Sequence, residues 1–189
     1  MRDFLGSYFD NFNRTLKVFV DNRQNRDCLE EAAGLLKGTR RSHSTIYLIG
    51  NGGSSAIAEH MAIDLTKNAG LRAMAISGSQ ALTTFSNDYG YDRVFQKAIE
   101  HFAYEKDVLI AISSGGESEN ILNACRAAKD KRMKIITFSG FRSDNPLRKE
   151  GHINFWVDSS AYGYIEIMHN LLIHYLNDRI IGSPTYKFR

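Results

Sequence analysis

Cysteine and proline are scarce in this chain of 189 residues, which has 2 of each. Cys28 and Cys125 lie far apart and form no CxxC pair, which favours reduced thiols in a cytosolic protein over a disulfide framework. An excess of charge of one sign is also missing, because 24 Lys and Arg residues face 21 Asp and Glu residues, for a formal charge of +3. The basic residues are scattered along the sequence, so we expect no nucleic-acid partner.

Long apolar runs are missing as well. No stretch reaches the roughly 18 apolar residues of a membrane span, and residues 1–26 contain no hydrophobic segment of a signal peptide. We therefore expect a cytoplasmic protein without a membrane partner. A hydrophobic fraction of 43% suits a compact core. We predict one domain over 1–189, with a helical region over 1–40, an α/β core over 44–181 and an extended tail over 182–189.

The first part of the chain has the periodicity of helices. Apolar residues recur there at spacings of three and four, at Leu5, Tyr8, Phe9, Phe12, Leu16 and Phe19. This pattern predicts an amphipathic helix whose apolar stripe needs a partner surface. A second helix is predicted over 28–37.

Beyond residue 44, short apolar segments alternate with helical patterns. Strands are predicted over 44–49, 72–76, 107–113, 134–139 and 153–157. Helices are predicted after Ser54 and over 91–102, 117–132 and 164–180. Apolar strands that alternate with helices of this length indicate a parallel sheet covered on both faces, with ligands at the carboxyl ends of the strands.

Two loops between a strand and a helix have the composition of an anion site. The first contains Asn51, Gly52, Gly53 and Ser54, and the second contains Ser113, Ser114 and Ser118. Each would bring backbone N–H groups, hydroxyls and a helix N-terminus to the same edge of the sheet, which favours a phosphate or sugar. Alternatively, the glycines serve only the turn and the serines only cap the helices. A third polar segment, 86–90, is predicted to be a turn before a helix.

These loops resemble the sugar isomerase (SIS) domain family and, within it, the phosphoheptose isomerases. The resemblance rests on the first loop with His60 beyond it, then Asn87-Asp88-Tyr89-Gly90, then the serine loop, and then His169 and His174. The resemblance implies a flavodoxin-like five-stranded sheet sandwiched by helices. It also implies a homotetramer in which the N-terminal helices pack together. By the same resemblance, the glycine loop with its Ser54 and the serine loop would hold the substrate phosphate and hydroxyls, and Asp88 would orient the sugar.

Four side chains on two predicted helices are candidate metal ligands. His60 and Asp64 are four residues apart and share one helix face, which is chelating geometry. Glu166 and His174 are eight apart on the last helix, and their side chains can lean toward a common point. Many phosphoheptose isomerases bind zinc through His and Glu on the first of these helices and Gln and His on the second. The resemblance thus implies a zinc site at these four residues, with Asp64 and Glu166 in place of the family's Glu and Gln.

The resemblance implies an isomerase that converts sedoheptulose 7-phosphate to a manno-heptose 7-phosphate through an enediol, for lipopolysaccharide or capsule synthesis. Asp64 or Glu166 would be the base, and His174 the acid. The departures at Asp64, Gly115, Gly163 and Glu166 leave two alternatives. One is a non-catalytic SIS-domain protein that binds a sugar phosphate or the replication initiator DnaA. The other is an isomerase of a different sugar phosphate.

Overall fold

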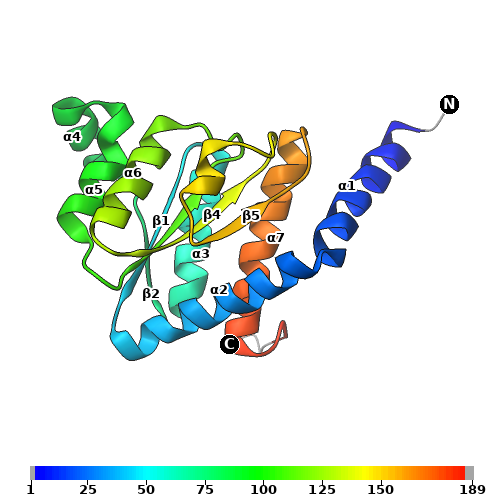
Figure 1. Cartoon of the computed structure of the whole chain (residues 1–189), viewed down its shortest axis with the longest axis horizontal. Helices are drawn as coiled ribbons and strands as arrows, with labels where there is room; N and C mark the ends of the chain where they lie inside the picture. The colour runs from blue at the N-terminus through cyan, green and yellow to red at the C-terminus, as the bar shows by residue number, and fades with distance from the viewer. Residues whose placement is uncertain (1–2, 186–189) are drawn as a thin grey trace.

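The computed structural model describes residues 3–185 and has α/β architecture (Figure 1). Two helices, α1 (Phe4–Asp21) and α2 (Arg23–Ser42), precede the sheet. The strands are β1 (Thr45–Gly50), β2 (Arg72–Ala75), β3 (Val108–Ile112), β4 (Lys134–Ser139) and β5 (Ile153–Trp156). The remaining helices are α3 (Gly53–Lys67), α4 (Ser79–Tyr89), α5 (Val94–Phe102), α6 (Glu119–Asp130) and α7 (Tyr162–Ile181), with short 3₁₀ turns at Tyr91–Arg93 and Pro146–Lys149.

The five strands form one parallel sheet in the order β2-β1-β3-β4-β5, which confirms the predicted flavodoxin-like sheet. Successive residues of β1 enter different cores. Ile46 and Leu48 pack with α2, α3 and α7 on one face, whereas Tyr47 and Ile49 pack with α5 and α6 on the other. This burial on both faces explains why the strands read as almost continuous apolar runs.

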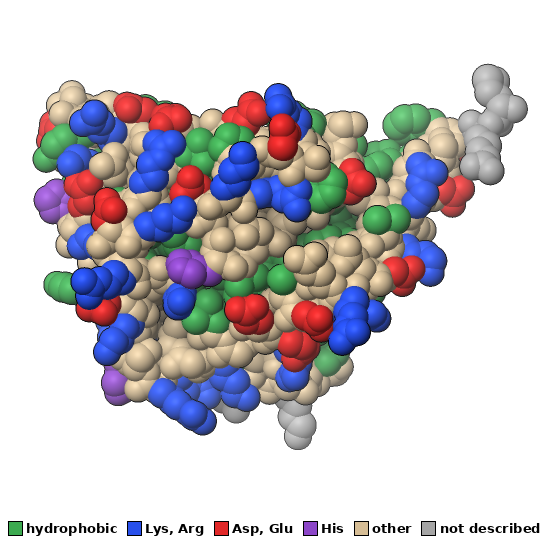
Figure 2. All heavy atoms as spheres, viewed as in Figure 1, with side chains coloured by type: hydrophobic (Ala, Val, Ile, Leu, Met, Phe, Trp, Pro, Cys, Tyr) green, Lys and Arg blue, Asp and Glu red, His purple; other side chains and the backbone are tan. Residues whose placement is uncertain are grey.

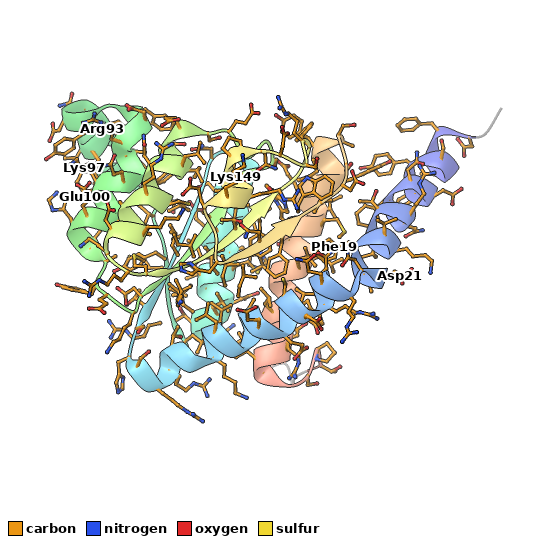
Figure 3. The ribbon with its side chains drawn as sticks, viewed as in Figure 1. Phe19, Asp21, Arg93, Lys97, Glu100 and Lys149 are labelled. Atoms are coloured by element: carbon orange, nitrogen blue, oxygen red, sulfur yellow. The ribbon has the colours of Figure 1, made fainter. Side chains whose placement is uncertain are left out.

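The first helix projects away from this body (Figure 1). Phe19 is its only buried residue and points toward β5, where its ring lies 6.4 Å from that of Phe155, whereas Asp21 points away (Figure 3). Hydrophobic side chains lie exposed on the projecting part (Figure 2). Asn22 separates the two helices and caps α2 by accepting a hydrogen bond from the Asn25 backbone N–H.

Two sequence predictions differ from the structure. Segment 86–90 was predicted to be a turn before a helix, and this was wrong, because residues 86–89 are the last turn of α4, which ends at Gly90 with φ at 88°. Helix α4 fully buries none of its residues, and its apolar contact with the core is limited to the partly buried Leu82 and Phe85. The second helix was predicted over 28–37 but extends over Arg23–Ser42. Part of the predicted tail, residues 186–189, lies outside the described residues.

Two further observations concern the surface. Among residues 3–185, no helix combines the length and apolarity needed to cross a bilayer. On the face drawn in Figure 2, basic and acidic side chains are interspersed rather than segregated.

The sheet order places the loops that follow β1 and β3 side by side. These strands are neighbours, but α3 after β1 packs on one face of the sheet and α6 after β3 packs on the other. A crevice opens at such a switch point, outside the carboxyl ends of the strands. The glycine loop (residues 50–55) and the serine loop (residues 113–118) both lie at this crevice.

Candidate active site

The serine loop is folded by its own hydrogen bonds. The Gly116 backbone N–H donates to the Ser113 carbonyl oxygen at 3.0 Å and also lies 3.2 Å from the Ser113 hydroxyl. The hydroxyls of Ser113 and Ser118 lie 3.2 Å apart. Gly116 has φ at 68°, and a Cβ there would lie 2.2 Å from Asn145 Oδ1. Only glycine fits this position, so the loop geometry is set by backbone sterics.

Ser114 is the serine of this loop whose hydroxyl has no hydrogen-bond partner within residues 3–185. The residue is buried, and its Oγ has no hydrogen-bond partner in the described part of the chain. A buried hydroxyl without a partner is costly unless a ligand or water satisfies it. Ser114 lies in the wall of a cavity of about 440 Å³ between the two loops and the start of α7. The cavity is lined by Asn51, Ser54, Ile112, Ser113, Ser114, Gly115, Glu117, Ser118, Tyr162 and Glu166.

The glycine loop lets α3 begin close to α7. A Cβ at Gly50 would lie 2.5 Å from the Ser54 carbonyl carbon, and Gly52 has φ at 53°. A Cβ at Gly53, the first residue of α3, would lie 2.9 Å from both carboxylate oxygens of Glu166. The missing side chain at Gly53 therefore admits the Glu166 carboxylate to the N-terminus of α3, where the helix dipole favours negative charge.

Asn51 links the glycine loop to the start of α6. Its side-chain amide pairs with that of Asn120, with both N···O distances at 3.0 Å, and its Oδ1 also accepts a hydrogen bond from the Tyr91 hydroxyl at 2.8 Å. Asn120 lies in the first turn of α6, 69 residues from Asn51. Sequence reasoning missed Asn120 and Tyr91, because neither belongs to a motif and only the fold brings them to the glycine loop.

A second group of polar side chains lies farther along α3 and α7. Asp64 Oδ2 is 3.5 Å from His60 Nε2 and 3.8 Å from His174 Nδ1. One ligand atom from each of the three residues lies within 4.8 Å of the other two. The sequence placed Glu166 in the same metal set, whereas the structure brings only these three residues together. Glu166 and Gly53 meet at one end of the two helices, and the cluster lies about two turns away.

His169 and Asp88, two residues on which the family resemblance rests, lie outside these groups. His169 is fully buried, and its Nε2–H donates to the Ser139 carbonyl oxygen at 3.1 Å. Burial lowers the pKa of His169 to about 4, with a smaller opposing effect of this hydrogen bond, so the ring is neutral. Asp88 lies exposed in the last turn of α4, accepts a hydrogen bond from Asn87 and does not line the cavity.

The sequence and the fold both match known proteins. The profile of the SIS domain family matches residues 7–140. The chain is 35% identical to a phosphoheptose isomerase of Helicobacter pylori over 98% of both chains. The solved phosphoheptose isomerase of Neisseria gonorrhoeae superposes with a TM-score of 0.86 at 30% identity, covering 93% of this chain and 97% of that one. The solved phosphoheptose isomerase of Francisella tularensis superposes with a TM-score of 0.85 at 29% identity, covering 95% of this chain and 97% of that one. The chain therefore belongs to the SIS domain family and, within it, to the phosphoheptose isomerases.

Proposed function

We propose that the protein is an aldose–ketose isomerase that converts sedoheptulose 7-phosphate to a manno-heptose 7-phosphate. The observation that carries this proposal is the cavity in which three serines of the serine loop face the Glu166 carboxylate. A phosphorylated sugar needs hydroxyl and N–H donors at one end and a proton acceptor at the reacting end. The family membership and the named relatives support the same reaction.

The serine loop suits the phosphate. Ser113, Ser114 and Ser118 line the cavity at the start of α6, where backbone N–H groups and the helix dipole favour an anion. The unpartnered Ser114 hydroxyl gains a hydrogen-bond partner when a phosphate oxygen binds. Chain atoms of the sugar then extend toward Asn51 and Glu166.

Glu166 is the stronger candidate for the base, because it lines this cavity, whereas Asp64 is engaged with His60 and His174. We assign Glu166 to removal of the proton from the carbon beside the carbonyl, which produces the enediol. Asp64 then has the role of holding His60 and His174. His174 Nδ1 faces Asp64, so its Nε2 is the nitrogen left to exchange a proton with the substrate oxygen.

The three-residue cluster fits a divalent metal ion. Two imidazole nitrogens and one carboxylate oxygen are zinc ligands, and tetrahedral bonds of about 2.0–2.2 Å would separate them by roughly 3.4 Å. The two distances to Asp64 Oδ2, 3.5 and 3.8 Å, are close to this value. We propose that His60, Asp64 and His174 hold zinc, which would supply Lewis-acid stabilisation of negative charge on the substrate oxygens.

We further propose that the protein is a cytoplasmic homotetramer. Phe4, Leu5 and Phe9 expose most of their apolar surface on the projecting α1. A second exposed apolar stripe follows α7 at spacings of four, at Ile167, Leu171 and Tyr175. Contacts between copies of the chain would bury both surfaces.

Proton NMR in deuterated water tests the reaction. The zinc-supplemented protein is incubated with sedoheptulose 7-phosphate, and we expect an aldose product and deuterium at the carbon beside the carbonyl. His174→Ala should abolish turnover without preventing folding. Full turnover by this variant would show that His174 does not exchange a proton with the substrate. Binding without exchange would indicate a sugar-phosphate-binding protein, and exchange only with other sugar phosphates would indicate a different substrate.

A further inference from the structure

The Asn51 side chain has an unusually complete set of partners for a residue in a ligand cavity. Its Oδ1 accepts two hydrogen bonds, from Asn120 Nδ2 at 3.0 Å and from the Tyr91 hydroxyl at 2.8 Å. One hydrogen of its Nδ2 is used by Asn120 Oδ1, also at 3.0 Å. A carboxamide offers two lone pairs and two N–H hydrogens. Only one N–H of Asn51 is therefore left for a ligand.

The two partners also hold the amide of Asn51 in place. In this structure the Tyr91 hydroxyl donates to the oxygen of Asn51, so both lone pairs of that oxygen are used and the group left free is an N–H. Asn120 is buried, so it has few alternatives to its bonds with Asn51.

We propose that Asn120 and Tyr91 are positioning residues that make Asn51 a hydrogen-bond donor toward the substrate. The free Nδ2–H is offered to the cavity that Asn51 lines, so the site recognises an oxygen acceptor of the sugar at this point. The amide pair also holds the glycine loop at a fixed distance from the first turn of α6 and hence from the serine loop. This inference rests on the proposed function for the identity of the ligand, but the orientation of Asn51 does not depend on it.

A double-mutant cycle tests whether Tyr91 acts through Asn51. Tyr91 is 58% exposed, so Tyr91→Phe removes one hydroxyl with little effect on packing. We expect this variant to raise KM for sedoheptulose 7-phosphate about three- to tenfold, as for one lost hydrogen bond, with kcat nearly unchanged. In an Asn51→Ala background, Tyr91→Phe should change KM no further. An equal change in both backgrounds, or none in either, would overturn the proposal.

Tyr104→Phe is the matched control, because Tyr104 is exposed and its hydroxyl has no hydrogen bond within residues 3–185. Its kinetic constants should equal those of the wild type. Asn120→Asp keeps an acceptor for Asn51 Nδ2 but removes the donor to Oδ1, and it should raise KM at least as much as Tyr91→Phe does.

Side-chain amide NMR of the free protein separates this inference from the proposed function. The Nδ2 hydrogens that pair Asn51 with Asn120 should exchange slowly with solvent in the wild type and faster in Tyr91→Phe. If the wild type shows no slowly exchanging pair, the positioning role fails whatever the substrate is. If the pair is present but sedoheptulose 7-phosphate is neither bound nor converted, only the proposed function fails.

Discussion

At the scale of single residues, the shape of the serine loop depends on Gly116, because no other residue fits its backbone conformation. Its φ is 68°, and a Cβ would lie 2.2 Å from Asn145 Oδ1. A side chain in this conformation costs about 1–2 kcal/mol before the clash is counted. Gly116→Ala should therefore lower the free energy of unfolding by more than about 1 kcal/mol and weaken phosphate binding, measured by urea denaturation and calorimetry.

The neighbouring Gly115 provides the control for this prediction. A Cβ at Gly115 meets no atom within 4 Å, so Gly115→Ala should leave the free energy of unfolding within about 0.5 kcal/mol of the wild type. Equal destabilisation by both variants would show that sterics at Gly116 do not shape the loop.

His169 makes stability depend on pH. Its pKa is lowered to about 4 by burial, against a reference near 6.5, so between these values the unfolded chain binds a proton that the folded chain does not. Stability is then complete above pH 6.5 and falls as the pH drops toward 4, by roughly 3 kcal/mol for this group. Urea denaturation at fixed protein concentration should show a smaller loss across this window in His169→Leu than in the wild type. Equal losses would argue against a neutral His169.

Residue types and spacing predicted some site residues better than others. His60 and Asp64 are four apart on one helix, so their proximity follows from local geometry, and the structure shows it. Glu166 and His174 share α7, but which part of α3 each meets depends on how the two helices pack. The partnership of Asn51 with Asn120 and Tyr91 depends on the strand order and has no local signal.

At the scale of elements, the strands were predictable and one helix was not. The apolar runs that became β1 and β3 are buried at almost every position, and this is the strongest signal that a sequence gives for a parallel sheet. Helix α4 gave a weak signal, because the two apolar residues that it packs against the core, Leu82 and Phe85, are only partly buried. The length of α2 was underestimated because Arg23, Arg40 and Arg41 extend it at both ends with charged, exposed turns.

The projecting helix α1 provides a test of assembly. Phe9 is 54% exposed on it, and the adjacent Asp10 is exposed and polar. If α1 packs against other copies, Phe9→Asp buries a charge in that contact and should shift the protein from a tetramer to smaller species in light scattering. Asp10→Asn should leave the mass unchanged. A wild type that is monomeric at micromolar concentration would contradict the assembly.

At the scale of the whole molecule, the proposed metal ion between α3 and α7 would link two distant parts of the chain. An ion that binds only the folded state at 100 times its Kd stabilises it by about 2.7 kcal/mol. Zinc should therefore raise Tm by roughly 5–10 °C for a chain of this size, and a chelator should reverse the rise. Differential scanning calorimetry with and without zinc measures the shift.

Two carboxylate variants identify the ligands in this experiment. Asp64→Asn should lose most of the zinc-induced rise in Tm, because Asp64 lies nearest to both histidines. Glu166→Gln should keep it, since Glu166 lies at the α3 N-terminus and not in the cluster. If Glu166→Gln also loses the zinc-induced rise in Tm, Glu166 is a metal ligand after all.

Helix α1 is attached by one buried side chain, Phe19, and by the partly buried Phe12 and Leu16, and this thin attachment has a consequence for folding. Residues of α2 through α7 share two cores, whereas the 18-residue α1 contributes a single buried side chain. A helix of this length is marginal in water when nothing packs against it. If copies of the chain associate as proposed, we expect the body of a newly made, dilute chain to fold first, and α1 to become fully ordered only when copies meet. Helical content should thus rise with protein concentration, so that circular dichroism of a dilution series follows association directly.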